Sequence, residues 1–349
     1  IIMLLKPRHL QHGDKIAIVS LSSGMLGEKE FIHKYYIAKE RFENDYGLSV
    51  VAMPNALRGR DFIYRNPKAR ADDLMQAFDD HEIKAVFCAI GGDDSIRLMP
   101  YVDFNVLRNN PKIFMGFSDT TITHFMMHKA GVVSYYGPSL MTDWSEYVEI
   151  NEYTKEALAK TLFSPAAPLN IPCSSYCSYE TDRVLWGEQN ISIRRPRFPN
   201  TGYEVLQGKG KVRGKLLGGC IDVFPMICGT KLWPCLDDWR GKLLLIETSE
   251  SNMDAQLLCE LLRNLQAQGI LDVIEGIVVG KPGYREKYEP YKEVYNKVVA
   301  YEADRPDLPI LYNVNVGHAY PIGVFPLGLE YEIDCDNKTL ALLEAATDN

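Results

Sequence analysis

The chain lacks long apolar runs and an excess of positive charge. No stretch of its 349 residues approaches the ~20 consecutive apolar residues of a transmembrane helix, which predicts a protein without a membrane span. The formal net charge is -8, from 38 Lys and Arg residues against 46 Asp and Glu residues. This balance argues against affinity for nucleic acid polymers or anionic membranes. The first residues also lack the segments of a secretory signal, so we expect a cytoplasmic protein.

Cysteines are present, but their spacing does not indicate a metal site. The eight are scattered along the chain, and only Cys173 and Cys177 lie close together. No second pair of Cys or His residues follows them at the spacing of zinc ligands. Without a secretory signal, scattered cysteines predict reduced thiols rather than a disulfide framework. We therefore expect neither a metal nor another cofactor.

Alternating strand and helix patterns in the first half predict an α/β fold. Hydrophobic residues make up 46% and charged residues 24% of the chain, which is long enough for about two globular domains. The alternation predicts a doubly wound parallel sheet with helices on both faces. The expected strands cover 15–20, 48–53, 85–89, 113–115 and 132–136, and the expected helices cover 28–45, 67–78, 120–130 and 151–162, with another from about residue 94.

A second α/β unit is expected in the second half. Its predicted strands cover 211–216, 243–246, 276–279, 310–312, 330–333 and 340–343, and its predicted helices cover 253–268 and 291–301. The segment 173–208 is long for a loop, so it is either functional or a set of short strands. We predict an N-terminal domain over 1–165, a linker over 166–184 and a C-terminal domain over 185–349.

One motif places a serine at the bend between an apolar strand and a helix, MGFSDTT over residues 115–121. The hydroxyl of Ser118 would lie at the carboxyl edge of the sheet, at the positive end of the helix. This pattern is typical of a nucleophile elbow, with Thr120 where G-x-S-x-G has its second glycine. A plain helix N-cap gives the same pattern, so both interpretations stay open.

A serine nucleophile needs a base, and the chain has only seven histidines. His33 and His81 lie in charge-rich helical stretches, which predicts exposure to solvent. His124 and His128 are four residues apart on a helix, but the Glu of H-E-x-x-H is missing and the helix is otherwise apolar. That pattern favours core or helix-surface positions over a zinc site.

His318 and Glu247 follow strands and complete a possible triad. His318 lies in a loop punctuated by Gly and Pro, NVGHAYP over 315–321. Glu247 directly follows the apolar strand 243–246, where an unpaired buried charge would be costly. Ser118, Glu247 and His318 therefore predict a hydrolytic triad. The alternatives are a histidine at a strand end and an acid that caps the helix near Asn252, for which Glu250 is the closer candidate.

Two backbone amides are candidates for an oxyanion hole. One is the N–H of Asp119, directly after the serine, and the other comes from Gly91-Gly92 at the end of a neighbouring strand. The glycines also open a G-G-D-x-[ST] pattern found in sugar and dinucleotide kinases, with Asp93 as the acid. Against a kinase, the first strand ends in LSSG without a nearby basic residue, rather than in a phosphate-binding loop.

These motifs together resemble the LD-carboxypeptidase family of serine peptidases, and most closely its microcin C immunity members. The likeness covers 7–17, GGDDSIRLMPY at 91–101, GFSDT at 116–120, LGG at 217–219, LIE at 245–247, GHAYP at 317–321 and FPLG at 325–328. The resemblance implies a triad of Ser118, Glu247 and His318, with an oxyanion hole from the amides of Gly92 and Asp119. It also implies no metal, a homodimer, and a C-terminal domain with a β-barrel-like sheet across a cleft from the N-terminal domain.

The resemblance leaves two substrates open. Immunity members cut the amide between a peptide-derived aminoacyl group and a nucleotide, and an aromatic residue of a long loop stacks on the base. Trp186 is that candidate here, with Gly91 beside the substrate, although Trp186 could equally anchor its loop. Other members cut the L,D amide of murein tetrapeptides. Many LD-carboxypeptidases carry Asn where this chain has Cys220, a departure that counts against both substrates. We favour the detoxifying cleavage of an aminoacyl-nucleotide; the alternatives are murein LD-carboxypeptidase activity and a non-catalytic module that binds small ligands.

Overall fold

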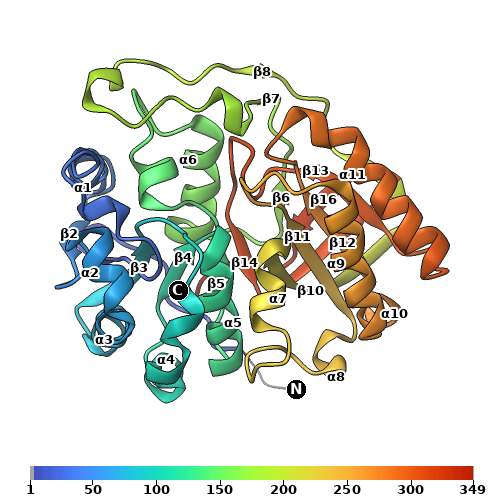
Figure 1. Ribbon diagram of the computed structural model, residues 1–349, viewed down its shortest axis with the longest axis horizontal. Coiled ribbons are helices and arrows are strands. Elements are labelled where there is room, and N and C mark those ends of the chain that lie inside the picture. Colours follow the sequence, from blue (N-terminus) through green and yellow to red (C-terminus); the bar gives the residue numbers. More distant parts are fainter. Residues whose placement is uncertain (1–3, 349) are drawn as a thin grey trace.

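The computed structural model describes residues 4–348. It contains two large sheets side by side, each flanked by helices, and one two-stranded sheet (Figure 1). As predicted, the first half of the chain forms a parallel α/β sheet and the second half supplies another sheet. In residues 4–348, no helix combines the length and apolar character needed to cross a membrane.

The first sheet has the strand order β14-β5-β4-β3-β1-β2. Strands β1 to β5 run parallel to their neighbours, whereas β14 comes from late in the chain and pairs antiparallel with β5. Its central strands are buried almost throughout, as expected for a parallel sheet covered on both faces. The bounds are β1 Lys15–Val19, β2 Ser49–Ala52, β3 Ile83–Cys88, β4 Ile113–Gly116, β5 Ser134–Tyr136 and β14 Phe325–Leu327.

The predicted helices of the first half are present, with two differences in type. The helix expected over 151–162 ends as a π-helix over Ala159–Phe163. The helix expected from residue 94 is a 3-10 helix over Ser95–Tyr101, which contains Pro100. Proline lacks the amide hydrogen that a continuing α-helix requires. The α-helices are α1 His33–Tyr46, α2 Gly59–Arg65, α3 Pro67–Asp79, α4 Phe104–Asn109, α5 Thr121–Ala130 and α6 Glu152–Leu158.

The second sheet is mixed and has eight strands, in the order β6-β16-β15-β10-β11-β12-β13-β9. Strands β10 to β13 are parallel, and the strands outside them pair antiparallel. The bounds are β6 Leu169–Ile171, β9 Glu204–Gln207, β10 Lys211–Cys220, β11 Lys242–Glu247, β12 Gly276–Gly280, β13 Ile310–Val314, β15 Glu330–Asp334 and β16 Thr339–Leu342.

Helices α7 to α11 accompany this sheet, and α9 shows how the sequence specifies them. Asp254 caps α9 by accepting a hydrogen bond from the backbone N of Leu257, 2.8 Å away. Leu258, Leu262 and Leu265 recur at helical spacing and form its buried face. The bounds are α7 Phe224–Ile227, α8 Leu236–Trp239, α9 Ala255–Ala267, α10 Ile270–Val273 and α11 Tyr288–Tyr295.

The long segment 173–208 passes along the top of the molecule in Figure 1 and contains short strands, which was one of its two predicted forms. Strand β7, Tyr176–Cys177, pairs antiparallel with β8, Phe198–Pro199. Short 3-10 helices lie at Glu180–Asp182 and Glu188–Asn190.

Strand pairing links the predicted domains. Strand β14 brings residues after 185 into the first sheet, and β6, within the predicted linker, pairs with β16 of the second sheet. One contiguous set of buried apolar side chains also contains residues from both halves of the chain, from Ala17 to Tyr312. The boundaries near 165 and 185 stay a prediction.

Candidate active site

Ser118 lies directly after β4, where the chain bends into α5. Its φ is 65°, a left-handed conformation that few non-glycine residues adopt and that is expected at a nucleophile elbow. Ser118 is the first residue of a 3-10 helix over Ser118–Thr120, whose N-cap is Phe117. Gly91 packs so closely that a Cβ there would lie 2.9 Å from the Ser118 Cβ. The bend therefore requires a glycine on the neighbouring strand end.

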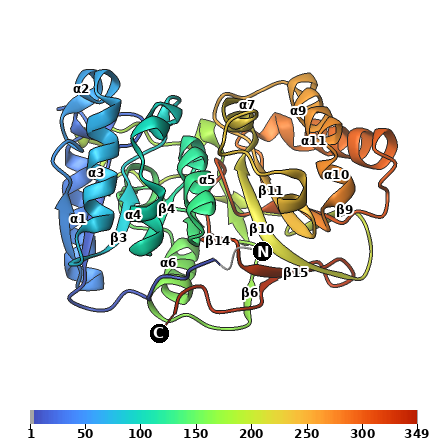
Figure 2. The ribbon, with the colours of Figure 1, turned by 90° about the horizontal axis from the view of Figure 1, so that it is seen from below.

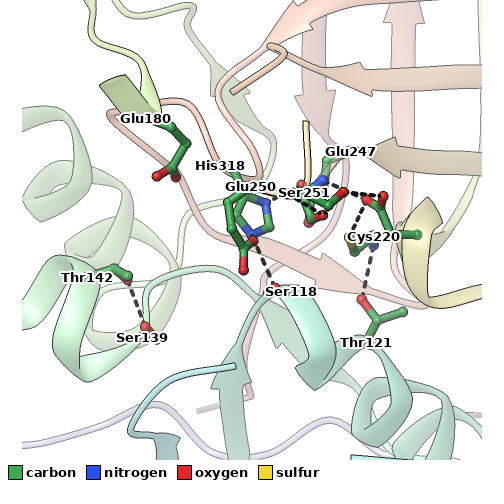
Figure 3. A network of polar contacts seen from close by, with 12 residues as sticks. Ser118, Thr121, Ser139, Thr142, Glu180, Cys220, Glu247, Glu250, Ser251 and His318 are labelled. Carbon is green, nitrogen blue, oxygen red and sulfur yellow. Dashed lines mark hydrogen bonds and ion pairs between the residues drawn. The ribbon is translucent and has the colours of Figure 1, made fainter. Parts of the chain in front are cut away.

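The structure brings the three residues of the predicted triad together (Figure 3). The Oγ of Ser118 lies 3.1 Å from Nε2 of His318, and Nδ1 of the same imidazole lies 2.8 Å from Oε2 of Glu247. Glu247 is 1% exposed and His318 is 8% exposed. A hydroxyl, an imidazole and a buried carboxylate in this order can activate an oxygen nucleophile.

Two close contacts fix the carboxylate and the imidazole. Glu247 ends β11 and packs against Gly317, whose φ is +98° and where a Cβ would lie only 2.4 Å from Oε2 of Glu247. The ring of Phe117 contacts the imidazole of His318 edge-on, with 5.1 Å between the ring centroids. Gly317 therefore has to be glycine for two reasons, its positive φ and the close approach of Glu247.

Tyr136 connects the carboxylate to the serine and was missed by the sequence analysis. From β5, its hydroxyl donates to Oε1 of Glu247 at 2.5 Å and accepts from the backbone N of Ser118 at 3.1 Å. Burial, followed by the charge of Glu247, raises the pKa of Tyr136 well above its usual value, so the phenol stays neutral and can donate. In the sequence, Tyr136 is one of two adjacent tyrosines in a strand, and nothing distinguishes it there.

Glu250 is a second carboxylate beside the imidazole. Its Oε2 lies 2.8 Å from Nε2 of His318, the nitrogen that also faces Ser118. Hydrogen bonding to His318 lowers the pKa of Glu250 to about 2, despite the opposing effect of burial. The sequence analysis weighed Glu250 only as a helix cap, a position that Asp254 occupies instead.

The two carboxylates govern the charge of the imidazole. Burial lowers the pKa of His318, but the charges of Glu247 and Glu250 and their hydrogen bonds outweigh burial and hold this pKa well above its usual value. Both carboxylates therefore favour the protonated imidazole.

The backbone amides proposed for an oxyanion hole lie close to the serine. Among residues 4–348, neither the N–H of Gly92 nor that of Asp119 has a hydrogen-bond acceptor in the protein. A Cβ on Gly91 would lie 3.2 Å from Oγ of Ser118 and 3.3 Å from the amide nitrogen of Asp119. Because Gly91 has no side chain, the space beside the Ser118 hydroxyl and the Asp119 amide stays open.

A cavity of about 220 Å³ opens above Ser118. Trp186 lies in its wall. Its ring centroid is also 6.4 Å from that of Phe31, in the turn before α1, and 5.0 Å from Nζ of Lys34 in α1. These contacts anchor the segment 173–208, while the same side chain contributes to the cavity. The other lining residues are Ser23, Met25, Ile90, Gly91, Gly92, Phe117, Ser118, Thr142, Arg183, Glu250 and His318.

His124 and His33 contribute to packing, whereas His81 is exposed, as predicted. His124 is buried, with Nδ1 2.8 Å from Oγ of Ser134 and Nε2 2.9 Å from the backbone O of Gly116. His33, predicted to face solvent, is instead buried, and its Nε2 lies 2.8 Å from the hydroxyl of Tyr147. In the described part of the chain, no three His, Cys, Asp or Glu residues are grouped to hold a metal ion.

Comparisons with known proteins identify the family. The N-terminal domain of the LD-carboxypeptidase family matches residues 16–137, and its C-terminal domain matches residues 213–333. The chain belongs to this family. It is therefore a serine-type peptidase, a hydrolase, and the kinase alternative drawn from Gly91-Gly92-Asp93 is wrong.

Curated relatives match nearly the whole chain. A putative carboxypeptidase of Vibrio cholerae is 28% identical over 342 residues, which cover 97% of this chain and 98% of the relative. The microcin C7 self-immunity protein MccF of Escherichia coli is 28% identical over 298 residues, covering 82% of each chain. A probable murein peptide carboxypeptidase of Bacillus subtilis is 28% identical, covering 97% of this chain and 94% of the relative.

Solved structures of LD-carboxypeptidase relatives share the fold. A MccF-like protein from Streptococcus pneumoniae, in complex with AMP, is 36% identical, with a TM-score of 0.87 over 95% of this chain and 99% of that chain. MccF in complex with aspartyl sulfamoyl adenosine is 25% identical, with a TM-score of 0.83 over 99% of this chain and 100% of that chain.

Proposed function

We propose that this LD-carboxypeptidase relative cleaves the amide between an aminoacyl group and a nucleotide, with Ser118 as nucleophile, His318 as general base and Glu247 as the group that orients the base. The continuous set of contacts from Oγ of Ser118 through His318 to Glu247 carries the proposal. The burial of Glu247 and His318 supports the proposal, because a buried, paired carboxylate holds an imidazole in one tautomer and one orientation.

The reaction follows from this arrangement. Nε2 of His318 accepts the proton of the Ser118 hydroxyl as Oγ attacks the carbonyl carbon, and Glu247 stabilises the imidazolium. The amides of Gly92 and Asp119 donate to the oxyanion. The imidazolium then protonates the departing nitrogen, the C–N bond breaks, and an ester remains on Ser118. Water, deprotonated by the same nitrogen, hydrolyses the ester and restores the serine.

The cavity favours a substrate with a planar base. Trp186 lies in the wall that contains Ser118, and stacking of a nucleobase on an aromatic side chain is worth about 1–3 kcal/mol. The relatives that bind AMP and aspartyl sulfamoyl adenosine support a nucleotide-like leaving group. Cleavage would separate the aminoacyl part from the nucleotide and so inactivate a toxic conjugate.

A murein tetrapeptide is the second candidate substrate. The relative from Bacillus subtilis named as a probable murein peptide carboxypeptidase is also 28% identical to this chain. We rank this substrate second because relatives are solved with AMP and with aspartyl sulfamoyl adenosine, which favours a nucleotide-like ligand.

The test is a direct comparison of the two substrates. The purified protein is incubated with an aminoacyl-nucleotide phosphoramidate or with murein L,D-tetrapeptide, and the products are identified by mass spectrometry. We expect release of the amino acid and the nucleotide amine. Release of only D-alanine would favour the murein activity, and binding without products would favour a non-catalytic module. Ser118→Ala should abolish turnover with unchanged folding, whereas the exposed Ser164→Ala should leave it intact.

A further inference from the structure

Nε2 of His318 has two competing neighbours in the cavity. Oγ of Ser118 lies at 3.1 Å and Oε2 of Glu250 at 2.8 Å (Figure 3). Attack by Ser118 needs this nitrogen as an unprotonated acceptor, whereas a carboxylate beside it favours an N–H. The carboxylate of Glu250 therefore competes with the Ser118 hydroxyl for this nitrogen. Arrival of the substrate must relieve this pairing.

Glu250 is placed where it can receive a substrate group. It lies on the loop after β11, its side chain is 58% exposed, and it lines the cavity beside Ser118. The hydroxyl of Tyr284 donates to its backbone O at 2.8 Å, which steadies the loop and leaves the carboxylate available. Arg183, the other charged residue of the cavity wall, pairs instead with Glu180 at 2.7 Å.

We propose that Glu250 binds an α-ammonium group on the acyl side of the scissile amide, and that this pairing frees Nε2 of His318 to face Ser118. The inference rests on the proposed function and names its substrate class: conjugates in which the cleaved residue has a free amino group. An ammonium group offers the carboxylate a charged hydrogen-bond donor in place of the imidazolium.

Geometry favours the acyl side. The carbonyl carbon must approach Oγ of Ser118, and the leaving nitrogen must face Nε2 of His318 to receive its proton. The α-ammonium nitrogen is two bonds from that carbon, so it remains within a few ångströms of Nε2. Glu250 lies at that distance from Nε2. A conjugate acylated at this nitrogen would lack the charge and leave Glu250 on the imidazole.

The first arm of the test uses paired substrates. An aspartyl-nucleotide phosphoramidate with a free α-amino group is compared with its N-acetylated form, using the full-length protein. We expect Glu250→Gln to lower kcat/KM for the free amine about 10- to 100-fold, which is the usual effect of losing a charged hydrogen bond. For the N-acetylated form, Glu250→Gln should raise kcat/KM, because it removes the carboxylate that stays on the imidazole of His318. Glu289→Gln, which removes an exposed charge on α11, should change neither.

The second arm measures the base without any ammonium. An uncharged alkyl fluorophosphonate labels an activated serine, and its labelling rate is followed against pH. The charged groups around the imidazole are Glu247 and Glu250, with Glu180 and Arg183 paired nearby. Glu250→Gln removes a charge that favours the imidazolium, so Ser118 should label faster and the midpoint of its pH profile should move to lower pH. Glu250→Asp should restore part of the wild-type profile.

The two arms separate failure of the inference from failure of the proposed function. Equal losses on both substrates in Glu250→Gln, or no change on either, would overturn the role of Glu250. If the wild type cleaves neither substrate, the proposed function fails. The labelling experiment alone then tests whether Glu250 acts on His318. An unchanged labelling midpoint in Glu250→Gln would in that case overturn the inference about Glu250.

Discussion

At the scale of single residues, the candidate site depends on contacts that one atom can disturb. Ser118 needs a left-handed φ, Gly317 leaves no room for a Cβ against Glu247, and the Tyr136 hydroxyl joins two of the three triad residues. Each of these features controls the position of a reacting group, where an error of about 1 Å can cost about 100-fold in rate.

Tyr136→Phe should lower catalytic activity by more than any loss of folded protein accounts for. It removes the donor to Oε1 of Glu247, and an unsatisfied buried polar group costs about 1–3 kcal/mol. We expect kcat/KM to fall about 10- to 100-fold. Tyr135→Phe is the matched control, because Tyr135 is also fully buried on β5 but donates to the backbone O of Ala346. Equal activity in the two variants would contradict the role given to Tyr136.

Gly317→Ala should move Glu247 and so reduce kcat about 100-fold or more. A Cβ there would overlap Oε2 of Glu247 at 2.4 Å. Gly229→Ala is the control for backbone strain alone. Gly229 also has a positive φ, +78°, but a Cβ added to it would have no neighbouring atom within 4 Å. We expect Gly229→Ala to lower only the free energy of unfolding, by about 1 kcal/mol. Comparable kcat losses in both would show that strain alone is responsible.

The triad could be found from the sequence because each member follows a recognisable apolar strand or lies in a Gly- and Pro-punctuated loop. Tyr136 and Glu250 could not be assigned these contacts from the sequence. Tyr136 bonds Glu247, which is 111 residues further along the chain. Glu250 contacts His318, which is 68 residues further along. Such contacts depend on how the two sheets pack, which local patterns do not encode.

At the scale of elements, the cavity wall depends on packing between α1 and the segment 173–208. Lys34 of α1 is 1% exposed, donates to the backbone O of Ser145 at 3.0 Å, and lies over the rings of Tyr147 and Trp186. Burial lowers the pKa of Lys34 to about 7, and the positive charge of Arg195 adds to this effect against the attraction of Glu146.

This lowered pKa predicts a pH dependence of stability. Above pH 7 the folded protein loses the Lys34 proton, whereas the unfolded chain keeps it up to about pH 10.4. The contribution of Lys34 to the free energy of unfolding should therefore rise with pH across this window, by up to about 1.4 kcal/mol per pH unit. Denaturant unfolding of wild type and Lys34→Met at several pH values measures it. A difference between them that stays constant from pH 7 to 10 would contradict the expectation.

Long, strongly patterned elements were predictable, and short ones were not. Strand β4 is a continuous apolar run and β3 is apolar apart from Lys84, and α3 and α9 have a helical period over 13 residues each. Helices α7 and α8 have only four residues each, too few to show a period. Strand β14 contains Pro326, which argues against a strand except at a sheet edge, and β14 is an edge strand.

At the scale of the whole molecule, the two sheets share packed side chains. Helix α5, which begins just after Ser118, lies where the two halves meet (Figure 2). Its Phe125 stacks on Trp233 with 5.6 Å between ring centroids and also packs on Phe224 and Trp239. Ser118 and His318, which come from different halves, are held close together by this shared core.

The shared core implies that both halves unfold together. We expect calorimetry to show one cooperative transition, with equal van't Hoff and calorimetric enthalpies. Phe125→Ala should lower the free energy of that transition by about 3–5 kcal/mol, because it leaves a cavity among large aromatic rings. Two well-separated transitions in the wild type would contradict a shared core.

The central claim is that Ser118 forms a covalent acyl intermediate with the help of His318. Acid quenching during turnover, followed by intact-protein mass spectrometry and peptide mapping, tests this claim most directly. The account predicts an adduct with the mass of the substrate's acyl part on the peptide containing Ser118, and none in Ser118→Ala. Turnover that persists in Ser118→Ala at an undiminished rate, or an adduct on another residue, would contradict it.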